Sequence, residues 1–174
     1  MSTASQVAIS VDAPGKVNLY LAVGDVRPDG YHPLTTLFAA VSLTETITVS
    51  EGQTPGLKQT PGLSLSMDIV PGSLVDQQMK AGQFDPAAVP MDERNLVYRA
   101  AELILAEHGI ESAPALHLHI AKAVPVAGGM AGGSADAAAA LIATDHYLHA
   151  TGRTGALLAQ TDYERLAAQL GADI

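Results

Sequence analysis

Hydrophobic and polar positions alternate along much of the first half of the chain. The alternation is clearest at residues 7–11 (V-A-I-S-V), at residues 16–23 (K-V-N-L-Y-L-A-V) and in two stretches within 34–50, of which Glu45–Val49 is the more regular. Because successive side chains of a strand point to opposite faces, this pattern predicts strands with one buried face. The turn residues Asp12–Gly15 and Pro28–Gly30 predict breaks between these strands.

Residues 51–90 lose this regularity. Pro-Gly pairs interrupt the segment at 55–56, 61–62 and 71–72. We expect one short strand, Leu63–Met67, inside a long excursion of the chain. The excursion is not expected to be a domain boundary, because neither side of it could bury a core alone.

Helical signals surround one more strand in the rest of the chain. The first element is a helix that is capped by Asn95 and ends at Gly109, and it is followed by a strand at 115–121. An alanine-rich helix is predicted at 134–149. A last helix is predicted to begin at the capping-box pattern Thr161–Glu164 and to stop at Gly171. Strands that come first, followed by helices around one more strand, predict the α+β class.

Composition limits the kinds of partner. The 9 Lys and Arg against 18 Asp and Glu give a net charge of −9, so we expect no attraction of nucleic acid or anionic lipid to the whole surface. There is no cysteine, which excludes disulfides, thiolate metal sites and cysteine nucleophiles. The apolar run Ala137–Ala143 is far shorter than the roughly 20 residues that span a bilayer. The N-terminus also lacks the features of a signal peptide, so we expect a cytoplasmic location.

A glycine-rich loop carries most of the chemical information. Residues 124–138 read V-P-V-A-G-G-M-A-G-G-S-A-D-A-A and run directly into the alanine-rich helix. Backbone amides of such a loop, together with the unpaired amides of the first helical turn, bind phosphate without surface basicity. Ser134 could cap the helix or bind a phosphate oxygen or Mg²⁺. The alternative is a tight turn whose glycines only allow close packing.

Three common loop motifs do not fit this segment. No lysine follows the glycines as in a P-loop, and G-G-M-A-G-G is not the dinucleotide pattern G-x-G-x-x-G. The serine-hydrolase pattern G-x-S-x-G fails because Asp136 stands at its last position.

The loop instead resembles the second signature of the GHMP kinases, P-x-x-x-G-L-x-G-S-S-A. The matching positions are Pro125, Gly129, Met130, Ser134 and Ala135. Four further stretches are similar to the family in the same order: Ala13–Leu19 (A-P-G-K-V-N-L), Asp29–His32 (D-G-Y-H), Glu93–Leu96 (E-R-N-L) and Gly171–Asp173 (G-A-D). The D-G-Y-H stretch resembles the branch of the family that phosphorylates a polyol linked to cytidine diphosphate.

The sequence also departs from the family's pattern. Ala127 and Ala131 stand where many members have glycine, and Met130 stands where leucine is usual. The excursion over 51–90 is longer than expected. The family continues past the position of Ile174 with a third glycine motif and a second domain, so the chain resembles an N-terminal portion.

The resemblance implies a fold and a function. The fold is an α+β GHMP-kinase N-terminal domain of the ribosomal protein S5 domain 2-like type, with a mixed, mainly antiparallel sheet packed with helices. Residues 1–174 would form the ATP-binding domain. The function is ATP- and Mg²⁺-dependent phosphorylation of a hydroxyl of cytidine-diphosphate-linked methylerythritol, in the non-mevalonate isoprenoid route. These residues alone are expected to be inactive, because one wall of the cleft would be missing.

Two other functions stay open. Another GHMP kinase of the homoserine or mevalonate type would explain the glycine loop, but its substrate offers no base for Tyr31 and His32 to contact. A non-catalytic nucleotide-binding domain would keep the loop and lose the pair Lys16 and Asp173, which is present here.

The resemblance also implies roles for individual residues. Asp173 would take the proton of the acceptor hydroxyl and Lys16 would steady the developing charge, while Asn18, Tyr31 and His32 would bind the cytidine-linked substrate. The residues implied for ATP are Asn95, Leu96, Lys122, Pro125, Ala127, Gly128, Gly129, Met130, Ala131, Gly132, Gly133 and Ser134, with Ser134 also placed to bind Mg²⁺. His117 and His119 share one face of a strand, and we interpret them as half-exposed strand residues rather than metal ligands.

Overall fold

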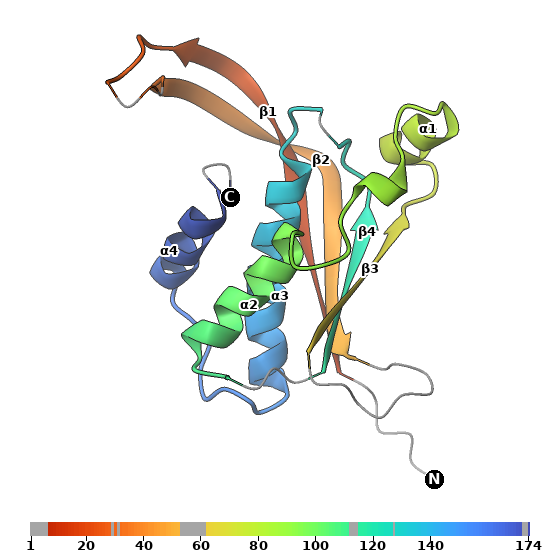
Figure 1. The fold of residues 1–174 in the computed structure, drawn as a ribbon, viewed down its shortest axis with the longest axis vertical. Coiled ribbons are helices and arrows are strands. Elements are labelled where there is room, and N and C mark those ends of the chain that lie inside the picture. The colour runs from red at the N-terminus through yellow and green to blue at the C-terminus, as the bar shows by residue number, and fades with distance from the viewer. Residues whose placement is uncertain are drawn as a thin grey trace.

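The computed structural model describes residues 7–28, 30, 32–52, 62–111, 115–126, 128–171 and 174. Its strands are β1 (Ala8–Val23), β2 (Leu34–Glu51), β3 (Leu63–Ile69) and β4 (Leu116–Lys122). They form one sheet in the order β1-β2-β4-β3, in which β3 and β4 are parallel and the other neighbours antiparallel. Helices α2, α3 and α4 stand together beside this sheet (Figure 1). The predicted α+β class with a mixed, mainly antiparallel sheet is confirmed.

The first two strands are longer than expected and form a bent hairpin. The prediction of a break at Asp12–Gly15 is wrong, because β1 runs through these residues with a register shift between Pro14 and Lys16. The irregular pairing at this bulge accommodates Pro14 and Gly15, which are unfavourable within a regular pair of strands. The two stretches predicted within 34–50 are likewise one strand. The far end of the hairpin bends across the top of α3 and projects beyond the helices on the side where α4 stands (Figure 1).

The excursion after β2 contains more structure than its sequence suggested. The predicted strand at Leu63–Met67 is confirmed as β3, but helix α1 (Leu74–Lys80) and the 3₁₀ turn η1 (Pro86–Ala88) were missed. Both begin at a capping side chain: Ser73 Oγ accepts from Asp76 N at 3.1 Å, and Asp85 Oδ1 accepts from Ala87 N at 2.9 Å. Such short elements give too few residues for a periodic signal.

The three longer helices follow the predicted order. Helix α2 (Leu96–Glu107) begins at Asn95, whose Oδ1 accepts from Val97 N at 2.9 Å, and is followed by Gly109 with φ of 66°. Both predicted ends are therefore confirmed. Helix α3 (Gly132–Ala150) begins two residues before Ser134.

Helix α4 (Gln160–Leu170) ends before Gly171 as predicted, but its N-terminus differs. Ala159 takes the N-cap position in place of Thr161. The capping-box prediction is wrong at this point: Asp162, and not Glu164, reaches back to accept from Ala159 N at 3.3 Å. Glu164 is bonded instead to the side chain of Gln160 at 2.9 Å.

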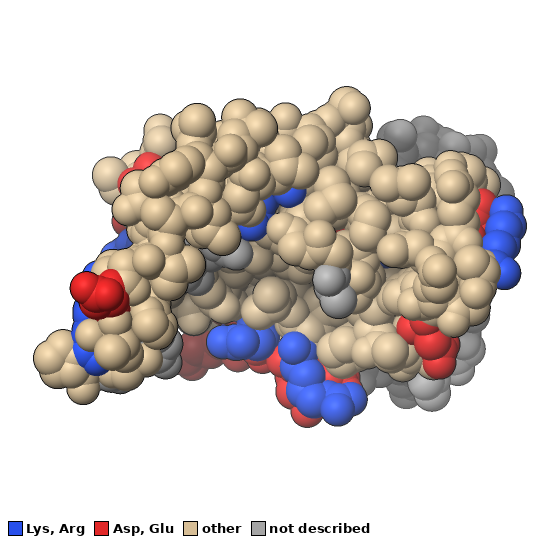
Figure 2. Space-filling model, turned by 90° about the horizontal axis from the view of Figure 1, so that it is seen from above, with Lys and Arg blue, Asp and Glu red and all other residues tan. Residues whose placement is uncertain are grey.

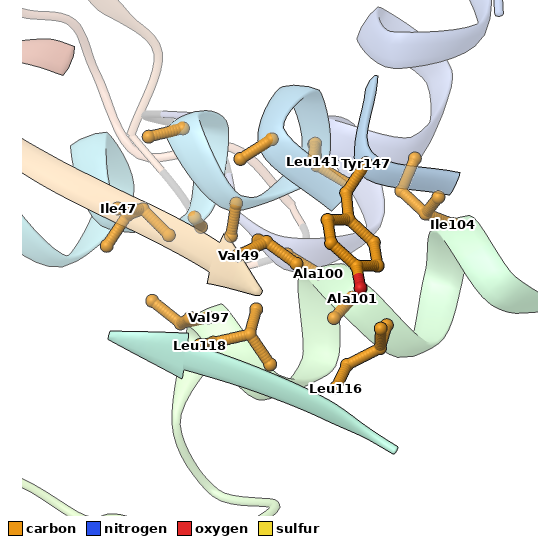
Figure 3. Packing of buried hydrophobic residues seen from close by; sticks show 14 of the residues in the cluster. Ile47, Val49, Val97, Ala100, Ala101, Ile104, Leu116, Leu118, Leu141 and Tyr147 are labelled. Atoms are coloured by element: carbon orange, nitrogen blue, oxygen red, sulfur yellow. The ribbon is translucent and has the colours of Figure 1, made fainter. Parts of the chain in front are cut away.

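The core lies between the sheet and helices α2 and α3. Figure 3 shows Ile47 and Val49 of β2 with Leu116 and Leu118 of β4, facing side chains of the two helices. The helix residues labelled there are Val97, Ala100, Ala101, Ile104, Leu141 and Tyr147. Because alanine side chains are small, the alanines on α2 and α3 let the two helices approach each other closely, at the packing density usual for protein interiors. Within the described ranges, no helix combines the length and apolar character needed to cross a membrane.

Candidate active site

A pocket of about 420 Å³ opens between the glycine loop and the residues that precede α2. Most of its wall comes from three places: the segment Ala88–Pro90, the start of α2 with Arg94, Asn95 and Leu96, and the loop from Pro125 to Ser134, in which Ala127 is not described. Lys122 and Asp136 complete the lining. Uncharged residues make up most of the surface at this end of the molecule, where Lys and Arg lie in small separate groups (Figure 2). An anion would therefore be held here by local groups, as the net charge of −9 predicts.

The glycine loop turns into α3 through left-handed backbone. Gly129 has φ of 70° and Ala131 has φ of 55°, so the first helical amides belong to Gly132, Gly133 and Ser134. Ala131 is the N-cap and has no side-chain acceptor, so the predicted capping role of Ser134 is wrong. The amides of the first turn lack intrahelical partners and carry the positive end of the helix dipole. These amides can bind the oxygens of a phosphate.

Strand β1 holds the loop from the other side. Lys16 N donates to Met130 O at 3.0 Å. This bond connects the backbone of the Ala13–Leu19 stretch to that of the glycine loop. A second, smaller pocket of about 320 Å³ lies at this junction and is lined by Lys16, Phe38 and Ile174 among others. Ala131 and Ser134 line both pockets, which therefore meet at the first turn of α3.

Lys16 and Asn18 point to the same side of β1, as predicted. Lys16 Nζ donates to Asn18 Oδ1 at 2.8 Å and lies 4.8 Å from the centre of the Phe38 ring. Asn18 Nδ2 donates in turn to Thr36 Oγ1 of β2 at 2.8 Å. The Lys16 ammonium is thus directed by two neighbours into a defined position beside the smaller pocket.

Three of the predicted site residues, Tyr31, Ala127 and Asp173, lie outside the described residues. His32 is described, on the turn between β1 and β2. Its Nδ1 is 2.8 Å from Gly24 O. A carbonyl oxygen only accepts, so this contact assigns the proton to Nδ1 and leaves Nε2 of the neutral ring as an acceptor.

Lys122 lines the larger pocket, but its ammonium is held by two carboxylates. Lys122 Nζ donates to Glu45 Oε1 at 2.6 Å and to Asp136 Oδ2 at 2.7 Å, and all three side chains are buried. Burial alone would lower the pKa of Lys122, but the nearby carboxylates of Asp136 and Glu45 outweigh it and raise that pKa. Burial raises the pKa of Asp136 to about 6, against the opposing effect of Lys122.

Asn95 also has a structural role at the pocket. Its Oδ1 caps α2, and its Nδ2 donates to Pro90 O at 2.7 Å. The side chain therefore joins the start of α2 to the wall formed by Ala88–Pro90. Asn95 shapes the pocket through these two bonds.

His117 and His119 are half-buried on β4, as interpreted from the sequence. Ser66 Oγ of β3 lies 2.8 Å from His117 Nε2 and 2.8 Å from His119 Nδ1. Burial, together with the neighbouring His119, lowers the pKa of His117. The two imidazoles thus cross-link the parallel strands.

Sequence reasoning missed two parts of the site. Glu45 was assigned only to a strand, although its parity with the buried Ile47 and Val49 placed a carboxylate on the core face. This spacing in steps of two residues with Ile47 and Val49 was the feature of the sequence that could have identified Glu45. The wall Ala88–Pro90 carried no such signal, because it belongs to the irregular excursion.

Known proteins resemble both the sequence and the fold. Residues 95–174 match the family described as GHMP kinases N terminal domain. The chain is 46% identical over 167 residues to 4-diphosphocytidyl-2-C-methyl-D-erythritol kinase of Mycobacterium avium, covering 96% of this chain and 43% of that protein. It is 43% identical to the protein of the same name from Paenarthrobacter aurescens, covering 95% of this chain and 45% of that one. The chain thus spans less than half the length of these curated relatives.

Solved structures agree with these matches. A crystal structure of 4-(cytidine 5'-diphospho)-2C-methyl-D-erythritol kinase has a TM-score of 0.58 and 32% identity, covering 95% of this chain and 47% of the other. Mevalonate kinase of Methanococcus jannaschii, at 15% identity and a TM-score of 0.56, shares the fold over 97% of this chain and 47% of its own. The family match over residues 95–174, the sequence relatives and the glycine loop at the start of α3 together show that this chain contains a GHMP kinase N-terminal domain.

Proposed function

We propose that the complete protein transfers the γ-phosphoryl group of ATP to a hydroxyl of 4-diphosphocytidyl-2-C-methyl-D-erythritol. The observation that carries this proposal is the meeting of two pockets at Ala131 and Ser134. ATP occupies the pocket lined by the glycine loop, and the acceptor hydroxyl lies in the pocket lined by Lys16. The names of relatives at 43–46% identity support the choice of acceptor. The cytoplasm is the proposed location.

The phosphates bind at the start of α3. Phosphoryl transfer depends mainly on positioning and charge stabilisation, and amides from Gly132 to Ser134 supply donors without adding side-chain bulk. Ser134 offers one hydroxyl oxygen where the pockets meet, which fits a Mg²⁺ ion that arrives with ATP and keeps phosphate and water ligands. Such an ion would neutralise charge on the phosphates. Leu96 and Lys122 line the part of the pocket proposed for adenine.

The acceptor side is proposed to use Lys16 and Asp173. Asp173 takes the proton of the attacking hydroxyl, and Lys16 keeps that carboxylate ionised and steadies the charge that develops on the oxygen. The neighbour of Asp173 in sequence, Ile174, lines the same pocket as Lys16, which supports this assignment. Asn18 contacts the methylerythritol part and holds the Lys16 ammonium at 2.8 Å.

The cytosine is proposed to bind at the turn of the hairpin. Tyr31 stacks on the base, and His32 accepts a hydrogen bond through Nε2. This tautomer matches the exocyclic amino group of cytosine, which is a donor. Mevalonate and homoserine have no such group.

The test is a measurement of ADP formation by the complete gene product with ATP, MgCl₂ and one acceptor at a time. We expect turnover with 4-diphosphocytidyl-2-C-methyl-D-erythritol and none with mevalonate or homoserine. Faster turnover of either of these would indicate another kinase of the family. ATP binding in calorimetry without transfer to any of the three would indicate a nucleotide-binding domain with no catalytic role.

A further inference from the structure

A buried ion cluster with one carboxylate in excess lies against the glycine loop. Its members are Glu45, Lys122 and Asp136, with side-chain exposures of 0%, 4% and 8%. One ammonium is shared by two carboxylates, so the cluster carries a net negative charge when all three are ionised. In the described part of the chain, Asp136 Oδ1 is buried and has no hydrogen-bond partner.

Stability does not explain why Asp136 is there. A buried carboxylate is unfavourable unless it is paired and its oxygens are bonded. Glu45 alone would neutralise Lys122, and it already accepts from Lys122 Nζ at 2.6 Å. The second carboxylate adds excess negative charge beside a site proposed for phosphates, and alanine would suit this helical position better. A residue that is unfavourable for folding points to a functional role.

The geometry indicates what that role is. Glu45 fixes the segment before the loop, because Ala123 N and Val124 N donate to its carboxylate at 2.9 and 3.2 Å. Asp136 lies in the first turns of α3, after the loop, and binds the same ammonium as Glu45. Lys122 therefore joins the two ends of the loop through one charged group.

The first turn of α3 has no side-chain cap to fix its position, so that position depends on this connection. Its N-cap Ala131 provides no acceptor. The backbone at the helix start also packs directly on the cluster: a Cβ added at Gly132 would lie 3.2 Å from Glu45 Oε1 and 3.3 Å from Lys122 Nζ. The position of the first helical amides is therefore set by the cluster.

We propose that Asp136 is a positioning residue of the nucleotide site, which holds the amides of Gly132–Ser134 in place through its ion pair with Lys122. This inference rests on the proposed function, since it assumes that ATP phosphates bind those amides. Asp136 does not need its charge for this role. It needs an oxygen that accepts from Lys122, which an asparagine also provides.

Two uncharged variants at residue 136 of the complete gene product distinguish the effect of its contact with Lys122 from the effect of its negative charge. D136N keeps the acceptor oxygen, whereas D136A removes it, and both remove the same negative charge. Isothermal titration calorimetry with ATP and MgCl₂ gives the dissociation constant, and thermal melts give the stability. We expect D136N to bind ATP as tightly as wild type or more tightly, and D136A to bind about tenfold more weakly than D136N. We expect D136A to melt at a temperature no lower than that of D136N.

Each other outcome overturns the inference. Dissociation constants of D136A and D136N within threefold of each other would show that the contact with Lys122 does not position the phosphate site. A D136A protein that no longer folds, or melts well below D136N, would make Asp136 a structural residue. Failure of the wild-type protein to bind ATP would instead overturn the proposed function on which the inference rests.

Discussion

At the scale of single residues, the site depends on backbone that only certain residues allow. Gly132 leaves room for a buried lysine and a buried glutamate, and Gly129 adopts a left-handed conformation. Ala131 adopts that conformation too, although a side chain disfavours it. Non-glycine residues in this region occur where the surrounding structure demands them, often at functional sites.

Gly132→Val is expected to abolish ATP binding. The β-branched side chain would collide with Glu45 Oε1 and Lys122 Nζ, both within 3.3 Å of the added Cβ. Titration calorimetry with ATP measures the effect on the complete gene product. Gly155→Ala is the control, since a Cβ at that position meets nothing within 4 Å. Affinity for ATP within about threefold of wild type would contradict a phosphate role for the loop.

Asp173→Asn is expected to lower kcat by about 10²–10⁴ and leave KM nearly unchanged. The amide has almost the same shape but cannot accept the proton. Lys16→Met should lower kcat similarly, and the double variant should be scarcely slower than either single one, because the two groups act as a unit. Steady-state kinetics on the complete gene product provide all three values. Losses that multiply in the double variant would show independent roles.

At the scale of elements, one buried carboxylate connects the three longer helices. Asp145 of α3 is fully buried and lies 2.6 Å from Nε2 of His108, the C-cap residue that follows α2. It also accepts from Leu158 N at 2.9 Å, just before α4, and from the hydroxyl of Tyr163 within α4. Because α3 begins at the glycine loop, this network anchors the far end of the helix whose first turn is proposed to bind phosphate.

Tyr163→Phe is expected to destabilise the protein by about 1.5–3 kcal/mol, the usual loss for a hydrogen bond to a charged group. Urea unfolding at pH 7 measures it, and Tyr20→Phe is the control because Tyr20 is exposed at 56%. A change below about 0.5 kcal/mol would show that the network does not hold α4 in place.

The pH dependence of stability follows from the same tyrosine. Burial, and then the Asp145 carboxylate, raises the pKa of Tyr163 above its ordinary value of 10.0. A raised folded-state pKa means that the stabilisation is complete below pH 10 and is lost as pH rises further, since the unfolded chain then releases this proton first. Wild type should therefore lose more stability than Tyr163→Phe between pH 9 and about 11. Parallel losses in the two proteins would contradict this assignment.

At the scale of the whole molecule, the hairpin and the glycine loop divide the proposed ligands. Lys16 lies beside the start of α3 with Asn18 bonded to it, and His32 lies on the turn between β1 and β2. The far end of the hairpin projects beyond the helices on the side where α4 stands (Figure 1). Large apolar side chains, among them Leu19, Leu21, Val23 and Leu34, are more than half exposed along it. The acceptor is therefore expected to lie along the hairpin, and ATP at the loop.

Tyr31→Ala tests this division. It should weaken binding of 4-diphosphocytidyl-2-C-methyl-D-erythritol by about 1–3 kcal/mol, roughly 5- to 150-fold, through loss of base stacking. ATP binding should stay nearly unchanged. Separate calorimetric titrations of the two ligands give both values. Equal weakening of ATP would show that the two ligands have been assigned to the wrong parts of the cleft.

Local features of the sequence determined much of this fold. The Asn95 cap, the stop at Gly109, the strand at 115–121 and the order of the elements follow from interactions between residues close in the chain. The glycine loop that leads into a helix is likewise confirmed, and the phosphate site predicted there stays a prediction that rests on consecutive backbone amides. The lysine and asparagine of β1 were placed on one side by the period of the strand alone.

Only the tertiary structure decided the features that depend on distant partners. Glu45 became part of the site because Lys122, 77 positions away, reaches it across the sheet. Strand β1 continues through Pro14 and Gly15 because the long strand β2 pairs with it on both sides of the bulge. Helix α3 begins at Gly132, where the backbone packs against Glu45 and Lys122 and where Met130 O accepts from Lys16 N of β1. No local pattern encodes these pairings, since each is stabilised by groups that folding alone brings together.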